Sequence, residues 1–600
     1  MSRQRPIGRR RPPALAAAFA MLLGLAAAAP AAAPPAAPAI LADVVLDPNA
    51  PAILADAGDL RAHYAVPIVE GGSVYTEVKG GAYTHSSEWE TQAWGVRRWD
   101  WKDGALVESW TRWSDWTPVP YAQFGTNPYG SGPLWEPVFQ PAARGDFLYV
   151  PGAGGTIDEI RKEDGALSAR IRPFGTAPDP RMFLTGPVVS SDAGVYFNVI
   201  ALDAENPWNA DTPGSWLVRI APGGAVSTLA YADLSGAPAA DAACEIAFPT
   251  AQLPFPPSRD ASPPTIPCGS PRPAVGAGPA VGDDGTVYAV ARSHFDGRWG
   301  WVVALGPDLG FRWAASLRNR LADGCGFAVP PTGGPGGCRE GALPGVDPET
   351  NQMPAAIVDD SSSAAPVPTP DGSVLYGAAT RYNFAQGHLM KFGTGGTFLG
   401  SYGFGWDTTP AVYAHDGTYA ILLKENRYDV GAYCGFSPFC PASRAAIYPD
   451  DPDAYFVTRL DPSLAPEWRF RNTNTQSCSP RPDGSLACVA DHPRGFELCV
   501  SLVAVGEDGS VYANAEDGNL YAIGSGGALR GRVFLESAEG AAYTPVVLAD
   551  GVVYAQNLGH LIAVDASAMR GCAPPGAPSA GRPPICAGPT SSPALVEPRP

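Results

Sequence analysis

Tryptophans gather in one short stretch of the 600-residue chain. Seven of the fifteen lie within 28 residues, at Trp89, Trp94, Trp99, Trp101, Trp110, Trp113 and Trp116. An indole offers a large rigid surface with one hydrogen-bond donor, which suits stacking against a sugar or a peptide. The other interpretation is that these rings pack one structural unit against the next. Trp89 and Trp94 lie in a loop-like stretch before a strand, so they are the candidate ligand-binding aromatics.

Other residue types that carry chemistry are scattered. The seven histidines show no H-E-x-x-H or paired spacing, no C-x-x-C occurs, and neither a G-x-S-x-G motif nor a phosphate-binding glycine loop is present. Asp450, Asp451 and Asp453 form an acidic group, but it lacks the glycine and the distant glutamate of an EF-hand loop, which favours a solvated turn. The sequence therefore predicts no catalytic residue, no cofactor and no metal ligand.

The eleven cysteines predict disulfide bonds, because the chain also carries an export signal. Neighbours along the sequence suggest local bridges at Cys244–Cys268, Cys325–Cys338, Cys434–Cys440 and Cys572–Cys586. A fifth bridge would use two of Cys478, Cys488 and Cys499, for which we take Cys478 and Cys488, and one cysteine stays free. Each bridge closes a short loop and contributes about 2–3 kcal/mol.

The export signal lies at the amino terminus. Five arginines between Arg3 and Arg11 precede the uncharged apolar run Ala14–Ala29, and small residues and prolines follow through Ala39. This order is typical of a secretory signal peptide cleaved between Ala29 and Ala39. A retained anchor is the alternative, but 16 apolar residues fall short of the roughly 20 that span a bilayer. No other segment is apolar enough to cross a membrane, so we expect a periplasmic or extracellular protein.

Composition excludes one class of partner. The net charge is −18, so the chain has no means of displacing counterions from phosphates, and we expect no nucleic-acid partner. Apolar residues make up 45% of the chain, which supports a large core, and the many glycines, prolines and aromatics favour a turn-rich all-β protein.

One pattern recurs eight times. It consists of an apolar strand, a tight turn that usually contains Asp-Gly, and a strand that ends in tyrosine, as in Asp508-Gly509-Ser510-Val511-Tyr512. Asp-Gly between apolar runs is a strong hairpin signal, because the turn needs residues that tolerate positive φ. The tyrosines are Tyr75, Tyr149, Tyr196, Tyr288, Tyr376, Tyr419, Tyr512 and Tyr554, and in six copies a proline precedes the tyrosine by eight to ten residues.

Each copy is followed by further strands, such as residues 216–220, 301–305 and 456–461, and then by a fourth, such as residues 310–313 and 467–470. Four short antiparallel strands per copy predict one β-propeller with eight blades and disulfide-stapled insertions in the long gaps. Seven or nine blades remain open. Residues 40–60 or the strand after Met569 could close the ring. The expected division is signal and Ala/Pro-rich segment 1–35, N-terminal segment 36–63, propeller 64–568 and Pro-rich tail 569–600.

The copy at residues 503–523 resembles the repeat of the pyrroloquinoline-quinone (PQQ)-type propellers, as do Leu460–Phe470 and Ala304–Trp313 more distantly. That family holds quinone-dependent alcohol and sugar dehydrogenases and also cofactor-free propellers, such as an outer-membrane assembly scaffold. The enzymes, by resemblance, hold the quinone against a tryptophan and, in the alcohol enzymes, a disulfide of adjacent cysteines, with a calcium ion. This chain has no adjacent cysteine pair. The long motif by which the blades of that family dock, with Ala, Asp, Thr, Gly and Trp in order, occurs here only in fragments.

These observations favour the non-enzymatic branch. We expect a monomeric exported propeller that presents its loops to a protein or glycan partner without catalysis. The alternative is a divergent quinone oxidoreductase, which would bind PQQ and calcium.

Overall fold

The computed structural model describes residues 39–570, apart from 58–59, 86–87, 122–134, 250–255, 322–323, 327–337, 381–386, 406–407, 428–453, 482, 484, 499–501 and 542. The predicted signal segment and the Pro-rich tail beyond Arg570 lie outside these residues, as do Asp450, Asp451, Asp453 and the cysteines Cys434, Cys440, Cys499, Cys572 and Cys586. No helix among the described residues is both long and apolar enough to span a bilayer.

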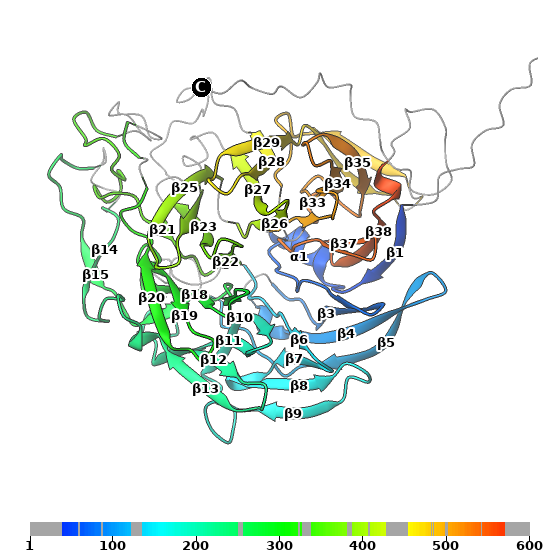
Figure 1. Cartoon of the computed structure of the whole chain (residues 1–600), viewed down its shortest axis with the longest axis horizontal. Helices are drawn as coiled ribbons and strands as arrows, with labels where there is room; N and C mark the ends of the chain where they lie inside the picture. The colour runs from blue at the N-terminus through cyan, green and yellow to red at the C-terminus, as the bar shows by residue number, and fades with distance from the viewer. Residues whose placement is uncertain are drawn as a thin grey trace, which may run out of the picture. The chain divides into compact units, whose positions relative to one another are not determined.

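Eight antiparallel sheets follow one another around a common axis, in chain order, as the colours of Figure 1 show. The eight-bladed, all-β propeller expected from the repeat is confirmed.

The first four sheets come from the first half of the chain. Blade 1 consists of β2 (Ile68–Glu70), β3 (Ser73–Gly81), β4 (Gln92–Lys102) and β5 (Ala105–Trp113). Blade 2 consists of β6 (Ala142–Arg144), β7 (Phe147–Pro151), β8 (Ile157–Arg161) and β9 (Leu167–Ile171). Blade 3 consists of β10 (Met182–Ser191), β11 (Gly194–Ala201), β12 (Gly214–Ile220) and β13 (Val226–Ala230). Blade 4 consists of β16 (Pro271–Pro273), β17 (Ala280–Val281), β18 (Val287–Ser293), β19 (Gly300–Leu305) and β20 (Phe311–Ser316).

The second four complete the ring. Blade 5 consists of β21 (Ala356–Ile357), β22 (Val367–Pro368), β23 (Val374–Thr380), β24 (Gly387–Phe392) and β25 (Phe398–Phe404). Blade 6 consists of β26 (Ala411–His415), β27 (Thr418–Arg427), β28 (Ala454–Leu460) and β29 (Pro466–Arg471). Blade 7 consists of β32 (Ala504–Val505), β33 (Val511–Asn514), β34 (Asn519–Ile523) and β35 (Leu529–Phe534). Blade 8 consists of β36 (Val547–Ala549), β37 (Val552–Asn557), β38 (His560–Asp565) and β1 (Ile40–Val45).

The ring is closed by the N-terminal strand β1, which pairs antiparallel with β38 as the outermost strand of blade 8. Residues 40–45 therefore supply the closing strand, one of the two sources expected. The propeller begins before residue 64, where the sequence placed its start, because this strand is donated from the segment that we had assigned to the N-terminal region.

The innermost strands tolerate proline because they are edge strands. In blades 4 and 5 the inner strand is split into two pieces, β16 with β17 and β21 with β22, and β10 of blade 3 shifts register between Thr185 and Val189. A proline on an edge strand removes no ladder hydrogen bond. The proline that recurs in six copies lies within the inner strand of its blade or one to two residues before the last piece of that strand.

Apolar cores lie between neighbouring blades rather than at the axis. All eight repeat tyrosines sit on the second strand of a blade and are at most 5% exposed. Tyr196 donates to the Pro307 carbonyl at 2.7 Å, and the Tyr554 hydroxyl accepts from Trp101 Nε1 at 2.8 Å. These contacts join blade 3 to blade 4 and blade 8 to blade 1. The recurrent tyrosine is therefore an inter-blade packing residue.

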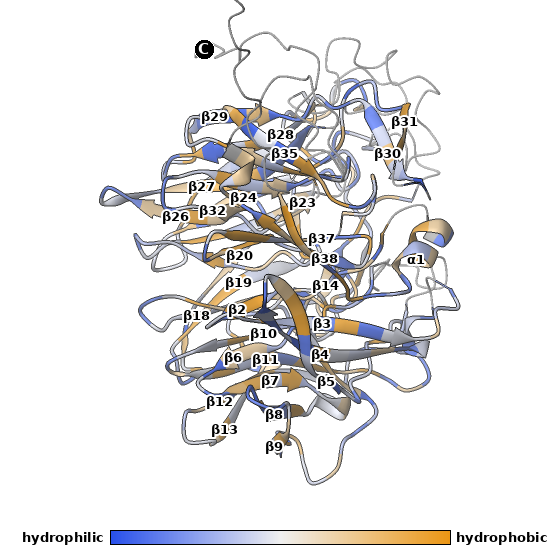
Figure 2. Ribbon diagram, turned by 90° about the vertical axis from the view of Figure 1, so that its right-hand side faces the viewer, coloured by the Kyte–Doolittle hydropathy of each residue, from blue (hydrophilic) through white to orange (hydrophobic). Residues whose placement is uncertain are grey.

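The insertions carry the remaining elements. Two small hairpins, β14 (Ala243–Glu245) with β15 (Thr265–Pro267) and β30 (Gln476–Pro480) with β31 (Leu486–Ala490), lie outside the blades. Disulfides join Cys244–Cys268, Cys325–Cys338 and Cys478–Cys488, as expected for these pairs. The α-helix α1 (Ala50–Ala57) follows β1 and lies at the end of the propeller opposite the β26–β27 turn, as Figure 2 shows.

Candidate functional site

Each blade places a carboxylate at the connection between its first and second strands: seven lie within the turn, and in blade 1 it is Glu70, the last residue of β2. Because every first strand runs in the same direction along the axis, these eight turns lie on one end of the propeller, which faces the viewer in Figure 1. We call this set the inner-turn ring. Its members are Glu70, Asp146, Asp192, Asp284, Asp371, Asp416, Asp508 and Asp550, all of them exposed.

The Asp-Gly chemistry of the turns explains why the ring exists. In blade 4 the Asp284 carboxylate accepts hydrogen bonds from the Thr286 backbone N–H at 2.9 Å and its hydroxyl at 2.6 Å. Gly285 then takes a φ of 77°, which a glycine adopts without a steric penalty. Asp508 accepts from the Ser510 N–H in the same way at 3.0 Å. The turns need a short acceptor side chain, and aspartate supplies both that acceptor and a charge.

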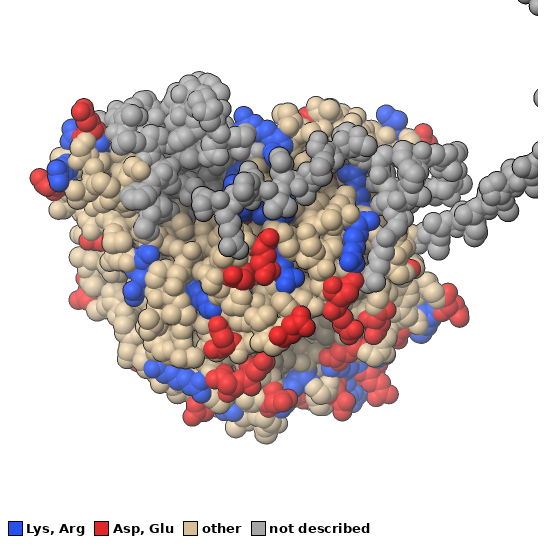
Figure 3. Space-filling view, turned by 45° about the horizontal axis from the view of Figure 1, so that its top comes forward, with Lys and Arg blue, Asp and Glu red and all other residues tan. Residues whose placement is uncertain are grey.

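The carboxylates of the ring reach solvent. The side chain of Asp416 is 95% exposed and that of Asp284 is 68% exposed. None of the eight turns contains a lysine or an arginine between the paired strands. Figure 3 shows acidic side chains gathered around a hollow on this face. Four of the eight carboxylates, those of Glu70, Asp284, Asp371 and Asp508, each pair with a lysine or an arginine, so the excess negative charge at this end of the propeller is that of the other four.

Several ring members also hold cations from strands further out. Lys391 approaches Asp371 to 2.9 Å, Arg530 approaches Asp508 to 2.9 Å, and Arg312 approaches Asp284 to 3.4 Å. Hydrogen bonds from Thr286 hold the pKa of Asp284 below its usual range. Burial opposes the ionisation of Asp371, but hydrogen bonds from Ser373, Thr369, Lys391 and Tyr419 outweigh it and lower its pKa. These carboxylates are therefore ionised at neutral pH.

The opposite end holds a buried group of charges near α1, which we call the Lys79 cluster. It comprises Lys79, Asp47, Glu77, Glu136 and Tyr64, none more than 4% exposed. Lys79 Nζ lies 2.6 Å from Glu136 Oε2 and 3.1 Å from Asp47 Oδ2. Tyr64 donates to Asp47 Oδ2 at 2.8 Å, and Glu77 Oε2 accepts the Ala65 N–H at 2.7 Å. The cluster joins β1, blade 1 and the chain that enters blade 2.

Burial and charge act against each other in this cluster. Burial alone would lower the pKa of Lys79, but attraction by Asp47, Glu136 and Glu77 outweighs it and raises that pKa. Burial raises the pKa of Glu77 well above its ordinary value, and Lys79 offsets only part of the effect. Glu77 Oε1 has no hydrogen-bond partner in the described part of the chain. Because its counter-ions enclose Lys79, the cluster holds β1, blade 1 and the chain that enters blade 2 together. Its members are buried and present no surface to a ligand.

Trp89 and Trp94 do not form an exposed stacking platform, and this expectation is corrected. Each is 2% exposed. Trp89 donates its indole N–H to the Val119 carbonyl at 2.9 Å, and Trp94 packs edge-on against Trp116 at 5.2 Å between ring centroids. The stretch that looked loop-like contains a 3-10 turn at Trp89–Thr91 and the start of β4, so both rings enter the core between blades 1 and 2.

Four of the other tryptophans of the run, Trp99, Trp101, Trp110 and Trp116, support the packing interpretation, whereas Trp113 at the end of β5 is 49% exposed. Trp99 lies in the apolar core between blades 8 and 1, and Trp101 borders that core. Trp116 donates to the Leu184 carbonyl of blade 3 at 3.0 Å. Because successive side chains of a strand point to opposite faces, one aromatic strand serves both of its neighbours. Neither the inner-turn ring nor the Lys79 cluster was predicted as a site, although the Asp-Gly turns that form the ring were recognised.

Comparison with known proteins gives similarity of fold only. No protein-family model and no curated protein matches the sequence. Among solved structures, BamB from Moraxella catarrhalis is similar with 10% identity and a TM-score of 0.38, covering 87% of this chain and 98% of that one. Quinohemoprotein alcohol dehydrogenase from Comamonas testosteroni gives 11% identity and a TM-score of 0.41, covering 84% and 74%. Sqt1 from Saccharomyces cerevisiae gives 10% and 0.39, covering 88% and 98%. At these scores the similarities carry no functional argument.

Proposed function

We propose that this chain is an exported, non-catalytic propeller that binds a protein partner through a basic surface of that partner. The observation that carries the proposal is the inner-turn ring, in which every blade contributes an exposed carboxylate to the same end of the molecule. A surface of one sign attracts a partner of the opposite sign, increases the rate of encounter and disfavours partners of like charge. Export is supported by the amino-terminal signal and by the three disulfides.

A basic peptide tests the proposal on the purified full-length chain. The probe is an oligolysine peptide of about 20 residues, titrated by calorimetry at low and at physiological salt, where screening should weaken the interaction. Two triple variants carry equal changes in charge. One neutralises the ring with Asp192→Asn, Asp416→Asn and Asp550→Asn. The matched control neutralises Asp103→Asn, Glu163→Gln and Asp308→Asn, which lie in turns between third and fourth strands at the same end but further from the axis.

The ring triple variant is expected to bind about tenfold more weakly, because three charges at the same end of the propeller each contribute a few tenths of a kcal/mol or more. The control variant is expected to change the affinity less than about twofold. Equal losses in the two variants, or no binding by the unaltered chain, would contradict a ring-centred partner site. Asparagine tolerates the positive φ of Asp416 and Asp550, so the turns should persist in the variant.

The alternative is a divergent quinone oxidoreductase, which the sequence resemblance implies. The chain has no adjacent cysteines to form the disulfide against which a quinone would stack in the alcohol enzymes. Incubation of the full chain with PQQ and calcium, followed by dye reduction with alcohols and sugars, separates the two functions. Quinone absorbance with substrate-dependent dye reduction would refute the non-catalytic proposal.

A further inference from the structure

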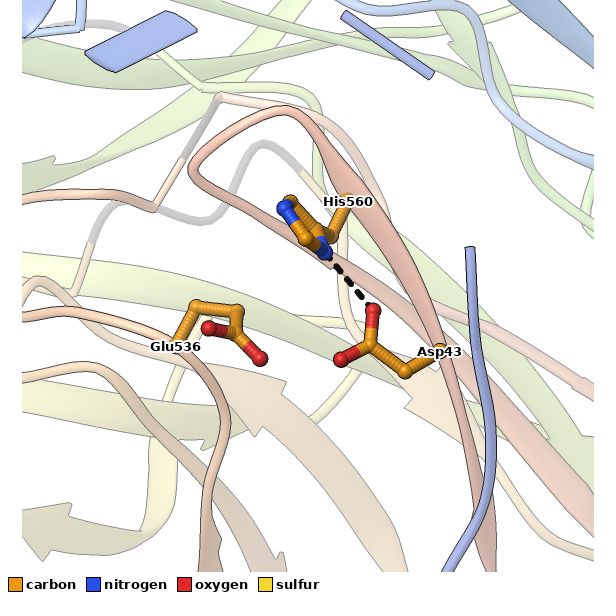
Figure 4. Close-up of side chains that lie close together, drawn as sticks. All are labelled: Asp43, Glu536 and His560. Carbon is orange, nitrogen blue, oxygen red and sulfur yellow. Dashed lines mark hydrogen bonds and ion pairs between the residues drawn. The ribbon is translucent and has the colours of Figure 1, made fainter. Parts of the chain in front are cut away.

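Three side chains with metal-binding atoms meet where the propeller closes. Asp43 comes from β1, His560 begins β38, and Glu536 follows the last strand of blade 7. One ligand atom from each lies within 4.8 Å of the other two. His560 Nδ1 and Asp43 Oδ1 are 2.7 Å apart, and Figure 4 shows the two carboxylates facing each other beside the imidazole. Among the described residues this is the one group of three such side chains.

The strand register explains why the group forms. Asp43 pairs with Ile562 and Val45 pairs with His560, so Asp43 and His560 lie two positions apart on the same face of blade 8. Ile562 on that face belongs to the apolar core shared with blade 7. Asp43 and His560 therefore project toward blade 7, where the chain leaving β35 delivers Glu536.

We propose that Asp43, Glu536 and His560 bind a divalent transition-metal ion such as Zn²⁺. One imidazole nitrogen and two carboxylate oxygens are a ligand set that Zn²⁺ accepts, with water in the fourth position. Asp43 is exposed and gives the ion access from solvent, whereas Glu536 is 7% exposed and anchors the inner side. The ion would neutralise two carboxylates that otherwise repel each other at this separation. All three side chains also make other interactions, so the ion would replace some of these contacts.

The bound ion would stabilise the closure of the propeller between its first and last strands. Its ligands come from residues 43, 536 and 560, which the unfolded chain does not hold together, so binding favours the closed propeller. The bound ion would hold β1 against both β38 and the end of blade 7. Its effect should therefore be largest on the opening of β1 and small elsewhere.

The test uses the full-length chain after removal of metals with a chelator. Zn²⁺ is titrated by calorimetry, Co²⁺ is added as a spectroscopic substitute, and hydrogen exchange is followed at residues 40–45. His560→Gln removes the nitrogen ligand. His415→Gln is the matched control, because His415 also pairs with a neighbouring aspartate, Asp416, at 3.5 Å, but has no third ligand in the described structure.

The unaltered chain and His415→Gln are expected to bind one Zn²⁺ alike, to raise their Tm by about 2–4 °C and to slow exchange in β1. His560→Gln should bind at least about tenfold more weakly and lose the visible Co²⁺ bands. Asp43→Asn is the second variant should His560→Gln fail to fold, and it should show the same loss. Equal binding by the ligand variants and the control, or no binding by the unaltered chain, would overturn the proposal.

Discussion

The two ends of the propeller use carboxylates in opposite ways. The inner-turn ring leaves its carboxylates at the surface, where members such as Asp284 and Asp508 stabilise their own turns and all eight contribute to the surface charge. The Lys79 cluster removes three carboxylates from water and holds them with one ammonium group. A buried charge is tolerated only while its partner is present, whereas an exposed charge can be changed at little cost. The cluster therefore holds segments of the chain together, whereas the ring carboxylates can be substituted at lower cost, which suits the binding role proposed for them.

The largest expected effect comes from Lys79→Met. The variant leaves Asp47, Glu77 and Glu136 buried without their cation, so it should lose about 3–5 kcal/mol of unfolding free energy, or fail to fold. The control is Lys162→Met, which removes a surface ion pair to Glu70 and should lose at most about 1 kcal/mol. Urea unfolding followed by tryptophan fluorescence measures both. Similar losses in the two variants would remove the distinction between the ends of the molecule.

A smaller effect is expected inside the ring itself. Asp371 accepts from Ser373, Thr369, Lys391 and Tyr419, so Asp371→Asn should destabilise by about 1–2 kcal/mol. Because the pKa of Asp371 is lowered by folding, its contribution should be present at neutral pH and lost as the pH falls through that lowered pKa. Asp416→Asn, which changes a side chain that is 95% exposed, should alter stability by less than about 0.5 kcal/mol. A large loss from Asp416→Asn would show that exposure does not separate structural from free ring members.

The third substitution, Glu77→Gln, is expected to increase the free energy of unfolding instead of lowering it. Folding raises the pKa of Glu77, so the protonated form is favoured in the native state, and the native state loses stability as the pH rises through that raised value. Glu77→Gln removes this loss. The stability of the variant relative to the unaltered chain should therefore increase as the pH rises above the ordinary carboxyl range, which thermal unfolding at several pH values measures. A relative stability that stays constant with pH would show that folding does not raise the pKa of Glu77.

The sequence predicted the blades because the local signals repeat. An Asp-Gly turn and the tyrosine that follows it can be recognised from neighbouring residues alone. The recurrence of this pattern in eight copies strengthened the prediction for each copy. The same local reasoning misplaced Trp94, because a stretch rich in polar residues begins the long strand β4. Burial at a blade interface depends on which blade packs beside the strand, and one isolated stretch of sequence does not specify this.

The two groups formed across distant segments had no local signal. Asp47, Lys79 and Glu136 come together only because the end of β1 and the connections around blade 1 meet at one end. Asp43 and His560 become neighbours only through ring closure. Scattered histidines therefore suggested no metal ligand, although residues 40–60 were recognised as a source of the closing strand.

The pairing of β1 with β38 also constrains the order in which the newly synthesised chain folds. The segment made first in the propeller finds its partner only after more than five hundred further residues have been synthesised. Until then blade 8 lacks its outermost strand, and the exposed edges of β1 and of the unfinished blades can pair wrongly. Such a long-range final contact favours slow folding, so we expect chaperones to act mainly on this last step.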